Sequence, residues 1–299
     1  MSTICASCGR AWKMTISSMR FKNEGFERVI WVRVILAYMQ VRQCSLISLG
    51  LAPYEQAWEL QGCLADKIGR GEHPPVLLLC EHLHTYTFGR RGQAKNLLWD
   101  EEELKRRGVS VHWVDRGGDV TYHGPGQLVG YPLLPLGRLV LRSIVSANGD
   151  EGSTARIPEA DYLGYIRQLE EMLILALMKL GMVSGQIQGK TGVWIQPDVL
   201  SHCIACPPRL RLRPAKIASI GVKVDARGVT RHGFALNVNP DMSYWEGIIP
   251  CGLEGTPAVS LAELLDPAPG MESAIQAVCK AFEQVFGCEL VETGMEPAR

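Results

Sequence analysis

Apolar runs of strand length and amphipathic helical stretches follow one another along this chain, without the strict alternation of strand and helix that builds a parallel sheet. The clearest helix covers residues 162–180, where apolar residues recur at steps of three and four. Runs typical of strands lie at 44–49, 75–80, 128–136, 217–224 and 229–238. This mixed order predicts an α+β fold, in which helices flank a mixed β-sheet.

Shorter segments complete the expected order of elements. Further helices are expected at 53–69, 100–107, 260–264 and 271–286, the third of them opened by a capping box of Ser260 and Glu263. Short strands are expected at 85–88, at 109–114, around Ile187 and around Val193. Two stretches without periodicity, 141–157 and 197–214, predict loops.

Residues 1–43 differ from the rest of the chain and are expected to be an extension outside the domain. Four basic residues precede the first acidic one, Glu24, which is a bias that organelle-targeting segments share. The favoured alternative is a translation start assigned too early, because Met39 lies just before the first regular pattern. We therefore expect one catalytic domain over 44–292, with insertions at about 141–157 and 197–214 and a tail at 293–299.

Charge and hydropathy exclude two classes of partner. The formal net charge is zero, whereas a nucleic-acid-binding domain shows a clustered basic excess. The longest apolar run near the start, Val29–Tyr38, is interrupted by Arg33 and is far shorter than the roughly 20 residues of a membrane helix. Ten dispersed cysteines are not the pattern of a small disulfide scaffold. We expect a cytoplasmic protein with free thiols, the alternative being organelle targeting through residues 1–38.

The segment RGGDVTYHGPGQ at 116–127 is the first candidate for a ligand site. Paired glycines allow close backbone approach and positive φ, and Arg116, Thr121 and His123 add directed polar groups. The alternative to a ligand site is a tight hairpin in which the glycines only satisfy the backbone geometry. Three polar side chains on one short loop favour the ligand site. The spacing is not that of a dinucleotide-binding loop.

Pro250-Cys251-Gly252 and Lys216 are the second candidate site. A thiol between proline and glycine lies on a turn that can expose a nucleophile and leave N–H groups free to stabilise an oxyanion. Lys216 opens an apolar strand, and a partly buried amine loses its proton more easily and can serve as a base. An inert turn cysteine and a solvated strand-end lysine are the alternatives that the residues alone leave open.

Two further motifs are given a structural interpretation. Gly189-Lys190-Thr191 is not a phosphate-binding loop, because that motif needs a glycine at position 184, where this chain has Ser184. The motif also needs a helix after it, whereas Gly192-Val193-Trp194 is typical of a strand. His232, on the strand paired with that of Lys216, is more often a structural histidine than a base.

Together these stretches resemble the lipoyl(octanoyl) transferase family. The matching words are RGGDVTYHGPGQ at 116–127, GKTGVW at 189–194, KIASIGV at 216–222, HGFALNVN at 232–239, IIPCG at 248–252 and SLAEL at 260–264. They occur in the family's order, and the resemblance covers roughly 44–290. It implies a single catalytic domain with a fold similar to the biotin and lipoate protein ligases.

The resemblance also implies a reaction and its residues. Octanoyl would pass from octanoyl-acyl carrier protein to Cys251 as a thioester, and then to a lysine of the lipoyl domains of 2-oxoacid dehydrogenase complexes or of the glycine cleavage H protein. Lys216 matches the lysine that lowers the thiol pKa and assists proton transfer. No metal or cofactor is implied, because the donor is already activated. The residues that match the family's substrate-binding segments are Arg116, Gly117, Gly118, Asp119, Val120, Thr121, Tyr122, His123, Ser219, Ile220, Gly221, Gly233, Phe234 and Ala235.

The insertion at 197–214 is the main departure from the family pattern, and it directly precedes Lys216. It contains Cys203-Ile204-Ala205-Cys206, and Cys5-Ala6-Ser7-Cys8 has the same spacing, but the two pairs are too far apart in sequence to favour a zinc site. Arg209, Arg211 and Arg213 form either a solvated loop, which is favoured, or a surface for an acidic carrier. The alternative functions are an ATP-dependent lipoate or biotin ligase and a non-catalytic acyl-binding homologue.

Overall fold

A computed structural model describes residues 42–136, 139–141, 156–158, 161–197, 213–250 and 257–294. From Arg42 onward the described residues belong to one compact unit. No helix among them is long and apolar enough to cross a membrane.

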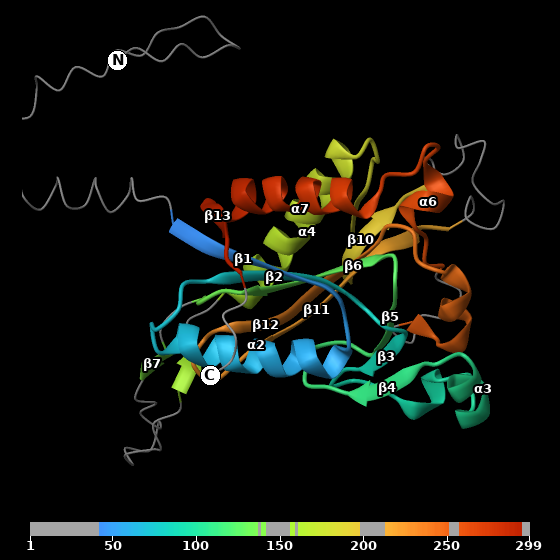
Figure 1. Ribbon diagram of the computed structural model, residues 1–299, viewed down its shortest axis with the longest axis horizontal. Helices are drawn as coiled ribbons and strands as arrows, with labels where there is room; N and C mark the ends of the chain where they lie inside the picture. Colours follow the sequence, from blue (N-terminus) through green and yellow to red (C-terminus); the bar gives the residue numbers. More distant parts are fainter. Residues whose placement is uncertain are drawn as a thin grey trace, which may run out of the picture. The chain divides into compact units, whose positions relative to one another are not determined.

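An eight-stranded mixed sheet forms the centre of this unit, in the order β13-β1-β2-β6-β12-β11-β10-β9 (Figure 1). β1 runs parallel to β13 and β2, and every other neighbouring pair is antiparallel. The strands are β1 (Arg42–Ala52), β2 (Val76–His82), β6 (Gln127–Leu133), β9 (Gly185–Ile187), β10 (Lys190–Ile195), β11 (Ala215–Val224), β12 (Thr230–Asn237) and β13 (Cys288–Glu292).

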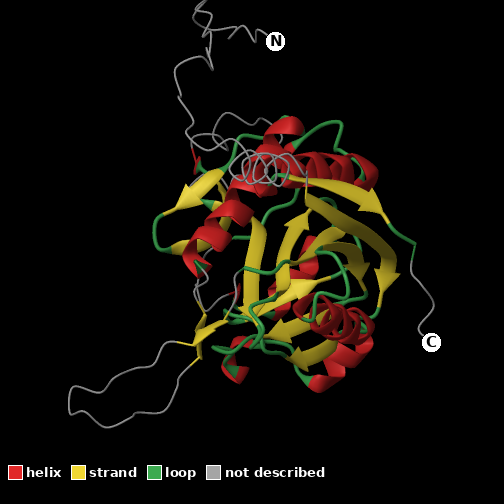
Figure 2. Ribbon diagram, turned by 90° about the vertical axis from the view of Figure 1, so that its left-hand side faces the viewer, coloured by secondary structure: helices red, strands yellow, loops and turns green. Residues whose placement is uncertain are grey.

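Helices cover both faces of the sheet (Figure 1 and Figure 2). α4 (Tyr162–Lys179) and α7 (Met271–Phe286) pack on one face, and α2 (Tyr54–Gly69) packs on the other. Alternate side chains of β2 point into different cores: Leu77 and Leu79 belong to the core under α4 and α7, whereas Val76, Leu78 and Cys80 belong to the core under α2.

A second, three-stranded sheet carries residues 120–123 of the 116–127 motif. It has the order β4-β3-β5, with β3 (Thr85–Phe88) parallel to β4 (Ser110–Trp113) and antiparallel to β5 (Val120–His123). A separate aromatic core that includes Tyr86, Tyr122 and Trp245 packs around it. α3 (Glu101–Arg106) lies in the connection between β3 and β4, and α6 (Leu261–Leu264) precedes α7.

Most elements expected from the sequence are confirmed, and three differences have physical reasons. Residues 120–123 form β5 rather than loop, because they pair with β3. β13 was not expected, since a five-residue strand without clear alternation shows itself only through its pairing with β1. The predicted loop at 141–157 begins and ends in paired strands, β7 (Leu139–Leu141) and β8 (Arg156–Pro158). Residues 1–41 and most of the insertion at 197–214 lie outside the described residues.

Candidate active site

A cavity of about 570 Å³ is lined by the β11–β12 hairpin on one side and by the 116–123 segment on another. This volume falls in the range of pockets that hold small-molecule ligands, about 300–1,000 Å³. The predicted site residues that line it are Arg116, Gly117, Gly118, Asp119, Val120, Thr121, His123, Lys216, Ser219, Ile220, Gly221, Gly233, Phe234 and Ala235.

Glycines let three backbone segments meet at this cavity. Gly221 of β11 is paired with Gly233 of β12, and a Cβ at Gly221 would lie 3.0 Å from the carbonyl oxygen of Gly117. A Cβ at Gly233 would lie 2.2 Å from the carbonyl oxygen of Gly130 in β6, which is far inside van der Waals contact. Because these glycines have no side chain, the 116–118 loop can lie close to β11, and β12 can lie close to β6.

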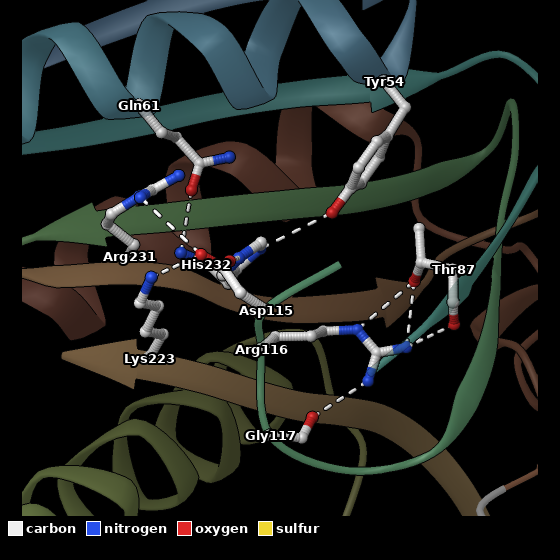
Figure 3. Close-up of polar contacts among 9 residues, drawn as sticks. All are labelled: Tyr54, Gln61, Thr87, Asp115, Arg116, Gly117, Lys223, Arg231 and His232. Atoms are coloured by element: carbon white, nitrogen blue, oxygen red, sulfur yellow. Dashed lines mark hydrogen bonds and ion pairs between the residues drawn. The ribbon is translucent and has the colours of Figure 1, made fainter. Parts of the chain in front are cut away.

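Residues 115–117 are each held by a different strand, and Figure 3 shows the contacts of Asp115 and Arg116. Nε2 of His232 in β12 donates to Oδ1 of Asp115 at 2.7 Å. The Arg116 guanidinium donates to the carbonyl oxygen and hydroxyl of Thr87 in β3, at 2.5 and 2.9 Å from Nη2. The Gly117 N–H donates to the carbonyl oxygen of Val222 in β11 at 2.9 Å. This part of the cavity wall is therefore preformed.

Buried His232 and half-buried Asp115 form an asymmetric pair. The hydrogen bond from His232, followed by the one from Lys223, lowers the pKa of Asp115 below its ordinary value. Burial lowers the pKa of His232, so the imidazole is neutral at pH 7 and its Nε2 carries the proton given to Asp115. His232 has a φ of 57°, and its N–H donates to Oε1 of Gln61 at 2.8 Å. These contacts fit the structural interpretation of His232.

Asp119 lines the cavity, but its carboxylate is used within the protein. Oδ1 accepts from the N–H groups of Val120 and Gln93, at 2.7 and 3.2 Å, and Oδ2 accepts from Nδ2 of Asn96 at 2.5 Å. Arg116, bound to Thr87, also spends much of its hydrogen-bonding capacity on the fold. Both side chains shape the cavity, and neither presents its whole polar group to a ligand.

The alternation of β5 separates its side chains. The side chains of Thr121 and His123 face the cavity, whereas those of Val120 and Tyr122 belong to the aromatic core on the other face, although Val120 also borders the cavity. The Tyr122 hydroxyl contacts Nδ1 of His84 at 2.9 Å. Tyr122 is therefore the predicted substrate-binding residue that the structure does not bring to the cavity.

Thr121 and His123 differ in how their polar atoms are satisfied. Oγ1 of Thr121 is buried, and no hydrogen-bond partner for it occurs among the described residues. A buried hydroxyl that lines a cavity without a partner is suited to a ligand, because leaving it unsatisfied costs free energy. His123 bonds through Nδ1 to Oε1 of Gln127 at 2.8 Å, and burial lowers its pKa well below 6.5.

Lys216 lies at the start of β11 with only 9% of its surface exposed. Its Nζ lies 4.7 Å from the centroid of the Trp194 ring, a cation–π distance. Its backbone N–H donates to the carbonyl oxygen of Pro257 at 2.9 Å, and its carbonyl oxygen accepts from Val259 at 3.0 Å. Lys216 thus combines a mostly buried amine with a backbone that is tied to the segment after residues 251–256.

Cys251 lies outside the described residues, which stop at Pro250 and resume at Pro257. Both ends of this gap are anchored in the described structure. The N–H of Ile249 donates to the carbonyl oxygen of Asn96 at 2.9 Å, and Asn96 is the residue that binds Asp119. The other end, Pro257, is bonded to the backbone of Lys216. No cluster of metal-binding side chains occurs in the described parts of the chain, and both C-x-x-C pairs lie outside them.

Comparison with known proteins gives the family. The family model described as the lipoyl protein ligase A/B catalytic domain matches residues 53–283. An octanoyltransferase of Acidobacterium capsulatum is 39% identical over 83% of this chain and 92% of its own length. Those of Cytophaga hutchinsonii and Chloroflexus aurantiacus are 34% and 37% identical over 82% and 83% of this chain, and 93% and 96% of theirs. This chain belongs to the octanoyltransferase family.

Solved structures with a similar fold are lipoate protein ligases. A bipartite archaeal lipoate protein ligase from Thermoplasma acidophilum has a TM-score of 0.58 at 16% identity, covering 85% of this chain and 88% of its own. A lipoate-protein ligase A bound with ATP has the same TM-score and identity, covering 85% and 90%. At this identity the likeness concerns the fold alone, and it confirms the α+β fold that the family resemblance implied.

Several residues of the octanoyltransferase cavity were not anticipated from the sequence. Tyr54, Val129, Tyr131 and Lys190 also line it, from the start of α2, from β6 and from β10. Val129 and Tyr131 are two residues apart on one predicted strand, and this spacing indicates that their side chains share a face of the sheet. Tyr54 had no such signal, because it comes to the cavity through the packing of α2 on the sheet. β10 includes Lys190 and is a strand, which confirms that Gly189-Lys190-Thr191 opens no phosphate-binding helix.

Proposed function

We propose that this octanoyltransferase moves an octanoyl group from octanoyl-acyl carrier protein to a lysine of a lipoyl domain, through a thioester on Cys251. The observation that carries the proposal is the cavity that Lys216 and the glycine-lined hairpin share with the buried Thr121 hydroxyl, for which the described residues contain no hydrogen-bond partner. The proposed acceptors are the lipoyl domains of 2-oxoacid dehydrogenase complexes and the glycine cleavage H protein. The proposed place of action is the cytoplasm, where a reactive thiol stays reduced.

In the first half-reaction the Lys216 amine takes the proton of the Cys251 thiol, and the thiolate attacks the carbonyl carbon of the octanoyl thioester. The bond from that carbon to the pantetheine sulfur breaks, and the sulfur leaves as a thiol with the proton from Lys216. The Thr121 hydroxyl is suited to donate to the carbonyl oxygen while it carries negative charge.

In the second half-reaction the neutral amine of the acceptor lysine attacks the carbonyl carbon bound to Cys251. The bond to the Cys251 sulfur breaks as the amide forms, and the proton lost by the attacking nitrogen passes through Lys216 to the thiolate. Thioester exchange changes the free energy little and amide formation is downhill, so the sequence of steps needs positioning and proton transfer but no ATP.

A mass measurement on the intact protein tests this function. The protein is incubated with octanoyl-acyl carrier protein in the absence of ATP, and we expect a mass gain of one octanoyl group that hydroxylamine removes. Cys251→Ala is expected to abolish the adduct. Cys251→Ser is expected to give no thioester adduct, that is, no octanoyl group with the hydroxylamine sensitivity of a thioester.

The control replaces an exposed thiol in α2, Cys63→Ser, which should load like the unchanged protein. An adduct that survives Cys251→Ala would contradict the thioester mechanism. Loading that depends on ATP would instead favour a ligase that activates a free acid, and no loading at all would favour a non-catalytic acyl-binding protein.

A further inference from the structure

β10 departs from regular strand geometry beside Lys216. Its register shifts between Val193 and Trp194 against β11, and again between Lys190 and Trp194 against β9. Gly192 lies within this irregular stretch with a φ of 118°, a conformation that residues with a side chain rarely adopt. Bulges of this kind redirect neighbouring side chains, often next to active sites.

The space left by Gly192 is occupied by the side chain of Lys216. A Cβ at Gly192 would lie 3.3 Å from Cε of Lys216, 3.6 Å from its Nζ and 2.7 Å from the carbonyl oxygen of Ala218. The lysine thus passes beside the bare Cα of Gly192 on its way to the face of the Trp194 ring. The position of Gly192 therefore sets the position of the Lys216 amine.

A carboxylate from the neighbouring helix holds Gly192. Oε1 of Glu170 accepts the N–H of Gly192 at 3.0 Å, in place of the sheet partner that the bulge removes, and Oε2 accepts from Nε2 of Gln186 at 2.9 Å. Glu170 lies on α4, which packs against β10 and β11, and only 7% of its surface is exposed. A carboxylate buried among the apolar residues of a helix costs free energy unless it is hydrogen-bonded, and here both oxygens have donors.

We infer that Glu170 is a positioning residue for the proposed base: it fixes the Gly192 bulge, and thereby holds the Lys216 amine where proton transfer needs it. The inference rests on the proposed function, because Lys216 is the base only there. In this inference the property of Glu170 that matters is the oxygen that accepts from Gly192, not the negative charge. A neutral side chain that keeps this oxygen is therefore expected to keep the enzyme active.

Three substitutions at two adjacent positions of α4 test the inference. Glu170→Met removes the acceptor while keeping the length of the side chain, and Glu170→Gln keeps an oxygen that can accept from Gly192. Glu171→Met changes an exposed neighbour on the same helix and is the matched control. Each variant is first compared with the unchanged protein in its thermal unfolding midpoint.

The single-turnover rate of octanoyl loading from octanoyl-acyl carrier protein is then measured at several donor concentrations. We expect Glu170→Met to lower the limiting rate roughly 10- to 100-fold, the cost of a small misplacement of a reacting group, with little change in the donor concentration at half-maximal rate. Glu170→Gln should recover most of that rate, and Glu171→Met should load like the unchanged protein.

Loading by Glu170→Met at the unchanged rate would overturn the inference, and so would an equal loss in Glu170→Gln. If Glu170→Met does not fold, Glu170→Asp takes its place, because its shorter side chain withdraws the oxygen from Gly192 while keeping the charge; the same loss is expected. The proposed function has a separate readout in this experiment, since it fails if the unchanged protein does not load Cys251 at all.

Discussion

The chemistry proposed for this enzyme depends on individual side chains whose surroundings differ from water. Lys216 is nearly enclosed, with Trp194 and Gly192 beside its side chain. Burial of a polar side chain makes its remaining contacts count for more, because water does not replace them. His82 is a second buried polar side chain, elsewhere in the fold.

Replacement of Lys216 is the direct test of its role. We expect Lys216→Ala to slow octanoyl loading of Cys251 by roughly two to four orders of magnitude, the usual contribution of a general base. The measurement is the single-turnover rate of the octanoyl mass gain. Lys179→Ala, at the exposed end of α4, is the control and should keep the full rate. A loss of less than tenfold for Lys216→Ala would argue against its assignment as the base.

His82 predicts how stability depends on pH. The ring is fully buried, its Nδ1 donates to the carbonyl oxygen of Ala52 at 2.9 Å, and its Nε2 contacts the Tyr131 hydroxyl at 2.7 Å. Burial lowers its pKa from 6.5 to about 4. Between these two values the unfolded chain binds the proton and the folded protein does not, so stability falls as the pH falls.

The expected contribution of His82 is a loss of about 2 kcal/mol of unfolding free energy between pH 7 and pH 5. Urea unfolding of the unchanged protein and of His82→Gln at both pH values measures it. The variant should lose correspondingly less stability over this interval, although it starts from a lower value at pH 7. An identical pH dependence in the two proteins would show that His82 does not titrate in this way.

At the scale of elements, the site depends on strands that approach one another more closely than side chains usually allow. β12 lies against β6 and β11 along a line of glycines, and the 115–117 segment is tied to β3, β11 and β12. These backbones form part of the cavity wall. The wall is therefore a property of strand pairing rather than of any one residue.

Gly233→Ala tests this close approach. Its Cβ would meet the Gly130 carbonyl oxygen and Pro132 Cδ at 2.2 and 2.7 Å, and backbone of this kind cannot move aside cheaply. We expect a loss of about 1–3 kcal/mol or more of unfolding free energy, the usual cost of overpacking. Chemical denaturation measures the change.

Gly185→Ala is the matched control, because Gly185 is also a strand glycine but has open space where a Cβ would lie. It should leave the unfolding free energy within about 0.5 kcal/mol of the unchanged protein, as surface substitutions usually do. Equal stability of the two variants would contradict the close approach of β12 and β6.

At the scale of the whole molecule, the described residues from Arg42 onward form a unit that contains both sheets, the helices that cover them and the cavity. β1 opens this unit, paired with β2 and with β13 from the other end of the chain. The pairing of the first and last strands closes the described fold. We propose that this unit is the catalytic domain, and that the extension expected at 1–43 ends at residue 41, because Arg42 and Gln43 belong to β1.

A shortened chain that begins at Met39 tests this proposal. It retains all of β1, so we expect its thermal unfolding midpoint and its rate of octanoyl loading to match those of the full chain. A chain that begins at Pro53 is the contrasting variant, because it lacks β1 and should lose stability or fail to fold. A loading rate for the Met39 chain well below that of the full chain would place part of the catalytic function in residues 1–38.

The sequence by itself determined the periodic elements, the α+β class and the motif residues. The helix at 162–179 and the strands at 217–224 and 230–237 follow from local apolar spacing, which a single segment contains in full. The same holds for the capping box of Ser260 and Glu263, since both residues lie within one turn. The sequence motifs shared with the family identified the glycines at 117, 118, 221 and 233, most of the cavity wall and Lys216.

Tertiary structure alone decided which side chains face the cavity and what holds them. Tyr122 belongs to a matching motif, yet the alternation of β5 turns it into an aromatic core. β13 and β5 exist because they pair with strands distant in sequence, and Tyr54 reaches the cavity through the packing of α2. Glu170 looks from the sequence like any charged residue on an amphipathic helix. Its role depends on the irregular pairing of β10 with β9 around Gly192, and such an irregularity arises from strand pairing, which no local pattern of residues specifies.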